Sequence, residues 1–70
     1  MTPNEKPLQP HQQRVADERH ELIFKVDKLA VFLKGDVFKT LPKDEQERLD
    51  RQYRIMSEYD AVLKERIAHF

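Results

Sequence analysis

The sequence of 70 residues contains no cysteine, no tryptophan and a single glycine. Without cysteine the chain can form neither a disulfide nor a cysteine-based zinc site, which are the usual stabilisers of very small domains. The lack of cysteine also suits a reducing compartment. No apolar run approaches the ~20 residues that span a membrane, and the proline-rich start does not resemble a signal peptide. We therefore expect a soluble intracellular chain with one domain at most.

The chain has no excess of charge of either sign. Thirteen Lys and Arg residues balance thirteen Asp and Glu residues, although 37% of all residues are charged. A protein that binds nucleic acid or anionic lipid through general electrostatic attraction carries surplus positive charge. The charge balance therefore argues against both kinds of ligand, and we expect no membrane partner.

Three of the four prolines lie within residues 1–10. Proline lacks a backbone N–H and biases the residue before it away from the helical conformation. Residues 1–10 are therefore predicted to be a disordered arm. Pro10 itself suits the first position of a helix, where a missing N–H costs nothing.

The segment from His11 to Lys34 has neither glycine nor proline, and its apolar residues recur with a helical period. This pattern predicts a helix over about residues 11–34. Gly35 follows directly, which favours a left-handed C-cap at that glycine. The apolar stripe of this helix consists of Val15, Leu22, Val26, Leu29 and Leu33.

A second helix is predicted over about residues 42–69, opened by Pro42. Residues 35–41 form the turn before it, and Val37, Phe38 and Leu41 are expected to pack beneath that turn. The apolar stripe of the second helix alternates steps of four and three. It consists of Leu49, Tyr53, Met56, Asp60, Leu63, Ile67 and Phe70.

Most charges of the second helix have a partner of opposite sign one turn away. An acid four residues before a base stabilises a helix by about 0.2–0.5 kcal/mol, so these charges indicate solvated helix surface. Asp60 is different because it interrupts the apolar stripe. Either a nearby base neutralises it or the stripe drifts, or else it is a buried polar residue that sets the register. The predicted pairs are Asp44–Arg48, Glu47–Arg51, Asp50–Arg54 and Asp60–Lys64.

Two long helices with a short connection predict an all-α protein, an antiparallel two-helix hairpin over residues 11–70. Such a hairpin has a single seam, yet Phe24 and Val31 on one helix and Ile55, Tyr59 and Val62 on the other form further apolar stripes. We expect a second copy to cover them, giving a homodimer that forms a four-helix bundle. The predicted core of the hairpin or dimer is Val15, Leu22, Val26, Leu29, Leu33, Leu49, Tyr53, Met56, Leu63 and Ile67.

No group of residues has the spacing that catalysis or metal binding requires. His11, His20 and His69 never stand three or four residues apart, as metal ligands on a helix do. Thr40 and Ser57 do not lie in a nucleophile elbow, and there is no glycine-rich phosphate loop. We therefore expect no enzymatic activity, no metal and no cofactor.

Large apolar side chains on a rigid helical frame are typical of protein–protein interfaces. Val37 and Phe38 at the bend are the strongest candidates, since the ends of a bundle are less completely covered. For each candidate, burial within the bundle or dimer is an equally simple interpretation. The candidate partner-binding residues are Phe24, Val31, Val37, Phe38 and Tyr59.

Two alternative functions depend on the arginines of the second helix. Arg48, Arg51 and Arg54 lie along it, but each has an acid one turn earlier. A helix that reads DNA presents an uncompensated basic face, so a DNA-binding repressor is the weaker alternative. The other alternative is an oligomeric sponge for cyclic nucleotide immune signals, with arginines of several copies lining a pocket.

Two parts of the chain carry a likeness to known proteins. They are His11-Gln12-Gln13-Arg14-Val15 with Asp17-Glu18, Glu21-Leu22, Lys28-Leu29 and Phe32, and Glu45-Gln46-Glu47-Arg48-Leu49 with Arg51-Gln52, Met56, Glu58-Tyr59, Leu63, Glu65-Arg66-Ile67-Ala68 and Phe70. Over residues 11–70 the chain resembles small helical proteins encoded in bacteriophage genomes. In size and style it is similar to the quorum-sensing anti-activators of pseudomonad phages.

This resemblance implies a dimeric, non-enzymatic protein that acts in the cytoplasm of an infected bacterium. Its implied partner is a host protein, a LuxR-type transcription activator whose DNA-binding region it blocks. The pilus assembly ATPase of the host is an implied second partner.

Overall fold

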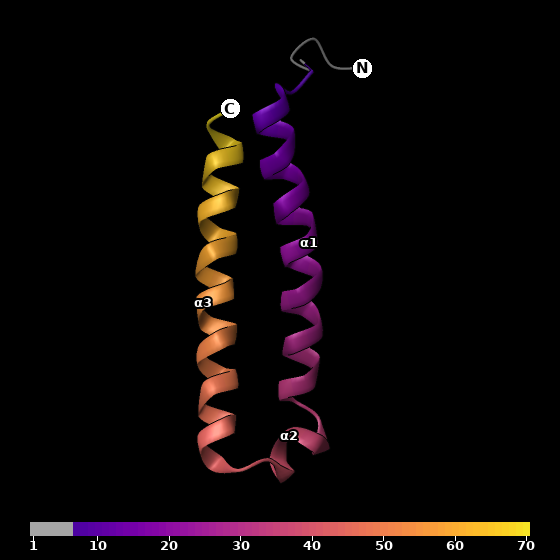
Figure 1. Cartoon of the computed structure of the whole chain (residues 1–70), viewed down its shortest axis with the longest axis vertical. Helices are drawn as coiled ribbons and strands as arrows, with labels where there is room; N and C mark the ends of the chain where they lie inside the picture. Colours follow the sequence, from indigo (N-terminus) through magenta and orange to yellow (C-terminus); the bar gives the residue numbers. More distant parts are fainter. Residues whose placement is uncertain (1–6) are drawn as a thin grey trace.

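The computed structural model describes residues 7–70 and contains three helices, α1 (Pro10–Leu33), α2 (Asp36–Thr40) and α3 (Lys43–Ala68). The two long helices lie side by side in opposite directions, and α2 occupies the bend between them (Figure 1). No β-strand is present in this part of the chain. The predicted all-α hairpin is thereby confirmed. The disordered arm predicted for residues 1–10 lies outside the described residues over positions 1–6.

The first helix begins at Pro10 and ends at Leu33, one residue earlier at each end than predicted. Proline is favourable at the first position because its fixed φ suits a helix. Just before it, the backbone N–H of Gln9 donates a hydrogen bond of 2.9 Å to the side-chain oxygen of Gln12. This bond satisfies a donor that would otherwise lack a partner at the helix start.

The predicted left-handed C-cap at Gly35 is wrong. Gly35 has φ −87° and ψ 170°, an extended conformation open to any residue, and it is the N-cap of α2. The end of α1 is closed instead by short turns, in which the N–H groups of Lys34 and Gly35 donate to the carbonyls of Val31 and Phe32 at 3.2 and 3.0 Å. The chain leads almost directly from one helix into the next, so it needs an extended residue at this point.

A serine at position 35 is expected to stabilise the protein. A Cβ atom there would meet only the carbonyl oxygens of Phe32 at 3.4 Å and Val31 at 3.8 Å, so it fits. Serine is a better N-cap than glycine and leaves the unfolded chain less freedom. We expect Gly35→Ser to raise the free energy of unfolding by about 0.5–1 kcal/mol, measured by urea denaturation. A left-handed glycine would instead make the same change destabilising by about 1 kcal/mol or more.

The bend is a short helix held by side chains on both sides. The hydroxyl of Thr40 donates to the carbonyl of Val37 at 2.6 Å. The side-chain amide of Gln46, in the first turn of α3, donates to the carbonyl of Leu41 at 2.9 Å. These bonds fix the passage from α2 into α3, which begins at Lys43 with Pro42 as its N-cap rather than its first residue.

The apolar residues of the bend do not all pack beneath it as predicted. Phe38 and Leu41 are half-buried, and the ring of Phe38 meets that of Phe32 edge to face, with ring centres 6.4 Å apart. Val37 is 61% exposed, so the prediction that it packs under the turn is wrong. The first turn of α2 points it outward because Phe38 already occupies the position against α1.

The core of the hairpin is small. Only Val15, Leu22 and Leu63 are buried among the described residues, and Leu63 is the most deeply enclosed at 1% exposure. The molecule measures 52 × 19 × 15 Å, so two helices share one seam and neither is covered on a second side. The other predicted core residues are half-buried, and they are Val26, Leu29, Leu33, Leu49, Tyr53, Met56 and Ile67.

Asp60 is neutralised across the seam. The side chain of Arg19 in α1 donates to its carboxylate at 3.0 Å, and both side chains are about a quarter exposed. A base close to Asp60 is one of the predicted explanations for its place in the stripe, although that base comes from the opposite helix. The predicted pair of Asp60 with Lys64 does not form among residues 7–70, where Arg19 is the ion-pair partner of Asp60.

Candidate binding surfaces

The outer face of α1 presents two large apolar side chains, Phe24 and Val31. They stand seven residues apart on the side away from α3, and they are 61% and 72% exposed. The ammonium group of Lys28 lies 4.4 Å from the centre of the Phe24 ring, a favourable cation–π distance. Shallow hollows of about 260 and 380 Å³ flank this ring. Phe24 is therefore a ridge on which a partner can fit from either side.

The rim of this outer face of α1 is charged. His20, Glu21 and Lys25 line the hollow before Phe24, and Asp27 and Lys28 line the one after it. An apolar centre within a polar rim is the general arrangement of protein–protein interfaces. The face thus combines an aromatic anchor with charges that can select a partner.

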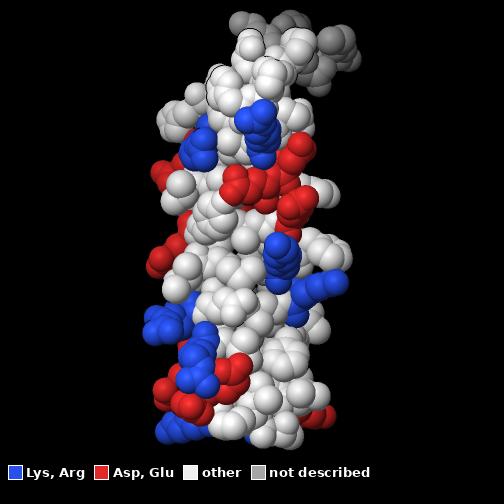
Figure 2. Space-filling model, in the orientation of Figure 1, with Lys and Arg blue, Asp and Glu red and all other residues white. Residues whose placement is uncertain are grey.

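The outer stripe of α3 consists of Ile55, Tyr59 and Val62, whose steps of four and three place them on one side of the helix. They are 57%, 41% and 50% exposed, whereas Leu63 next to them points into the seam. Uncharged side chains cover the centre of the molecular face drawn in Figure 2, below a band of charged ones, and charges of both signs mix around the start of α3. Apolar surface is therefore left uncovered on both long helices.

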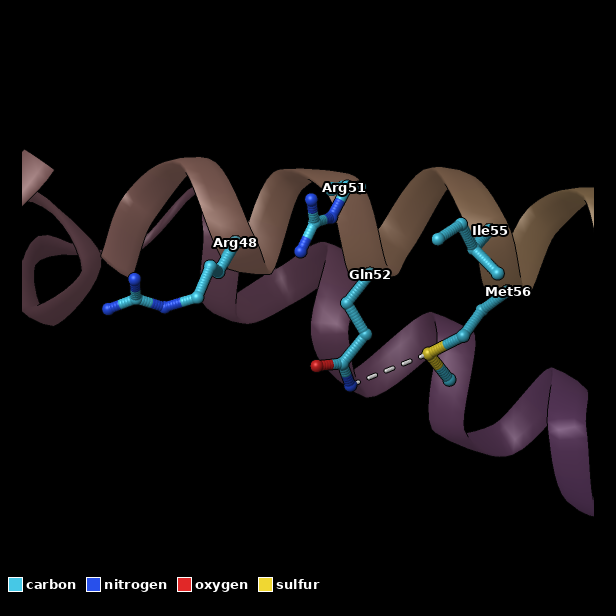
Figure 3. Close-up of a pocket in the computed structure, with 5 residues that line it drawn as sticks. All are labelled: Arg48, Arg51, Gln52, Ile55 and Met56. Carbon is cyan, nitrogen blue, oxygen red and sulfur yellow. Dashed lines mark hydrogen bonds between the residues drawn. The ribbon is translucent and has the colours of Figure 1, made fainter. Parts of the chain in front are cut away.

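A third surface is the arginine hollow of about 340 Å³ on α3 (Figure 3), lined by Arg48, Arg51, Gln52, Ile55 and Met56. The amide of Gln52 lies 3.7 Å from the sulfur of Met56 and closes one wall. Because all the lining residues come from one helix, the hollow is open and has no opposite wall.

The arginines of this hollow differ in their partners. The guanidinium of Arg48 donates to Glu45 at 2.8 Å and to Asp44 at 3.3 Å, and the bond to Glu45 raises the pKa of Arg48. Arg51 takes part in no ion pair within the described chain, so the predicted pair with Glu47 does not form there. The charge of Arg51 is thus available to a ligand or to another chain.

The sequence-predicted partner-binding residues fall into two groups. Phe24, Val31, Val37 and Tyr59 are all exposed, by 41% or more. Phe38 is half-buried, because its ring packs on Phe32. The structure therefore does not bring the five candidates together on one surface.

The described residues offer neither a cluster of metal ligands nor a membrane-spanning helix. Residues 7–70 contain no group of three or more His, Asp or Glu side chains placed to hold a metal ion. Within the same range, no helix is long and apolar enough to cross a membrane.

Comparison with known proteins places the chain among phage proteins. The family model described as Sequestin matches residues 9–69, which include all three helices. An uncharacterized 7.5 kDa protein encoded in the denB–rIIB intergenic region of Enterobacteria phage T4 is 38% identical over 60 residues. That match covers 86% of this chain and 94% of the phage protein. No solved structure matches.

Proposed function

Since the chain belongs to the Sequestin family, we propose that it acts by sequestering a partner rather than by catalysing a reaction. The name of the family supports capture of a partner, and the relative in phage T4 supports a role during infection of a bacterium. In this proposal the protein works in the cytoplasm of the infected host.

The proposed partner is a protein of the bacterial host. The observation that carries this proposal is the outer face of α1, where Phe24 and Val31 are more than half exposed on a rigid helix. Aromatic anchors that fill a partner's pocket contribute most of the binding energy in many interfaces, and a surrounding polar rim excludes water. Val37, 61% exposed at the bend, offers a further apolar side chain to a partner.

The specific form of this proposal rests on the resemblance to phage anti-activators. In that form the partner is a LuxR-type transcription activator, and the pilus assembly ATPase is a second one. The mechanism is steric, because a rigid hairpin seated on the DNA-binding region of an activator excludes DNA from it. The zero net charge of the chain favours apolar contact over mimicry of DNA, which would need a strongly acidic face.

A homodimer is also part of the proposal. Three buried apolar side chains are a small core for residues 7–70, and apolar stripes on α1 and α3 remain exposed. Domains of this size are often stabilised by association with another copy. Dimerisation would cover one of the two stripes and leave the other for the partner.

The arginine hollow supports a second candidate, a sponge for cyclic nucleotides. Arg51, without an ion pair in residues 7–70, is a donor for a phosphate group. Since the hollow is open, such a site would need further walls from other copies. This candidate therefore predicts an oligomer whose melting temperature rises when cyclic nucleotides are added.

Affinity capture tests both candidates. The full chain, carrying a tag, is used as bait in lysates from a panel of bacteria, and bound proteins and small molecules are identified by mass spectrometry. The proposal predicts one host protein in stoichiometric amount. Co-purified cyclic nucleotides without such a protein would favour the sponge. If neither is captured from any lysate, both candidates are contradicted.

A further inference from the structure

The outward side of α3 carries charges in a regular arrangement around its apolar residues. Arg51, Glu58 and Glu65 repeat every seven residues, and Ile55 and Val62 lie between them. Together the five positions advance by steps of four, three, four and three, which is the spacing of a helix-pairing seam. All five side chains are exposed and point away from α1, whereas Leu63 of the same helix packs toward α1 and is only 1% exposed.

We propose that this five-residue row on α3 is a self-association face. A second copy of the chain docks on it antiparallel, with Arg51 of each copy paired to Glu65 of the other. The proposal deepens the homodimer proposed above by assigning its face and its register. It does not depend on the identity of the sequestered partner.

Neither end charge of this five-residue row has a partner within the described hairpin. Neither Arg51 nor Glu65 takes part in an ion pair within residues 7–70, and both are exposed. The neighbouring Arg48 and Arg54 differ, because they pair with acids of their own helix at 2.8 and 3.8 Å. Glu58, between them, is unpaired in the same range as well, so Arg51 and Glu65 are the unpaired charges of opposite sign that another chain can bring together.

The order of the charges determines the direction of the second copy. In a parallel pair Arg51 would face Arg51 and Glu65 would face Glu65, so both ends would repel. In an antiparallel pair related by a two-fold axis, each Arg51 meets a Glu65, and the attraction occurs twice. The same register sets Ile55 of one copy against Val62 of the other, so an apolar pair forms on each side of the two-fold axis.

Glu58 provides an internal check on the register. It stands midway between Arg51 and Glu65, so the two-fold axis brings it close to Glu58 of the other copy. Like charges opposite one another weaken association. Removal of this charge should therefore tighten the dimer, which is not expected if the two copies meet on any other face.

The outer face of α1 remains free in this arrangement. Phe24 and Val31 lie on the other long helix and outside the self-association face. A dimer of this kind therefore presents two copies of the partner-binding face. In this arrangement α3 provides the self-association face, and α1 provides the face that captures the partner.

The proposal is tested by the dissociation constant of the dimer, measured on the full chain by analytical ultracentrifugation over a range of concentrations. We expect Arg51→Glu and Glu65→Arg each to raise this constant by at least about tenfold, because each change turns two attractions into two repulsions. The double variant R51E/E65R should return to within about threefold of the parent, since the pair is restored with reversed signs. Glu58→Gln should lower the constant several-fold.

Matched controls separate the effect of position from that of charge. Arg14→Glu and Glu21→Arg make the same changes at exposed positions of α1 and should leave the dissociation constant unchanged. All substituted side chains are exposed, and circular dichroism checks that each variant keeps its helices. A parent that is monomeric throughout, or a double variant as weak as either single one, overturns the proposal. Host-protein capture by a monomeric parent would leave the sequestering function standing.

Discussion

Leu63→Ala is expected to lower the free energy of unfolding by about 3–5 kcal/mol, which leaves much of the protein unfolded at 25 °C. Leu63 is 1% exposed and belongs to the core cluster with Val15 and Leu22. Truncation removes its contacts and leaves a cavity that two rigid helices cannot close. A core in a chain this small rarely supplies more than about 3–5 kcal/mol, so the loss is comparable with the whole. The helical signal in circular dichroism, followed against urea, measures it.

Two further variants show whether the effect comes from the cavity. Leu63→Met nearly conserves volume and should cost less than about 1.5 kcal/mol. Val31→Ala removes apolar atoms from a side chain that is 72% exposed, and it should change the stability by no more than about 0.5 kcal/mol. If Leu63→Ala were as stable as Val31→Ala, the packing of α1 against α3 would be contradicted.

The course of both long helices could be predicted because periodicity is a local property of the sequence. Val15 and Leu22 stand seven apart, as do Met56 and Leu63, and such pairs lie on one side of a helix wherever the helix packs. An antiparallel arrangement then follows from the short connection between the helices. The partner of Asp60 did not follow in the same way. Lys64 is closer in sequence, but Arg19 lies directly across the seam at 3.0 Å.

The bend was harder to predict because the same signals fit different geometries. A glycine after the last periodic residue suits a left-handed cap, but it equally suits an extended N-cap when another helix follows. Only the tertiary position of α2 decides between them, and Gly35 is extended. Likewise, the spacing of Val37 and Phe38 does not tell which of the two is buried. In the structure Phe38 is half-buried because its ring packs on that of Phe32.

The arginine hollow shows the same limit at the level of the candidate site. Sequence spacing offered Glu47 as a partner for Arg51, yet no ion pair forms between them in the described chain. An exposed pair at this spacing contributes only a few tenths of a kcal/mol, which is too little to determine the side-chain conformation. The availability of Arg51, on which both the sponge and the antiparallel dimer depend, therefore became evident only from the structure.

The double variant Phe24→Asp/Val31→Asp is expected to weaken binding of the captured host protein by at least about 30-fold, the effect of losing an interface hot spot. Both residues lie on the outer face of α1, which the antiparallel dimer leaves uncovered. Two carboxylates there would have to lose their hydration on contact with an apolar partner, and Lys28 can compensate only one of them. Calorimetry with the host protein recovered by capture measures the loss.

Phe70→Asp is the matched control for this variant. Phe70 is 43% exposed at the end of the hairpin opposite the bend. Phe70→Asp therefore also places a carboxylate at an exposed apolar position, but at a distance from the outer face of α1. It should leave binding within about twofold of the parent, and ultracentrifugation should find both variants in the same oligomeric state as the parent. If the folded double variant binds the host protein as tightly as Phe70→Asp does, the outer face of α1 is not the capture surface. The sequestering function would then require another surface, and the bend offers one because Val37 there is also 61% exposed.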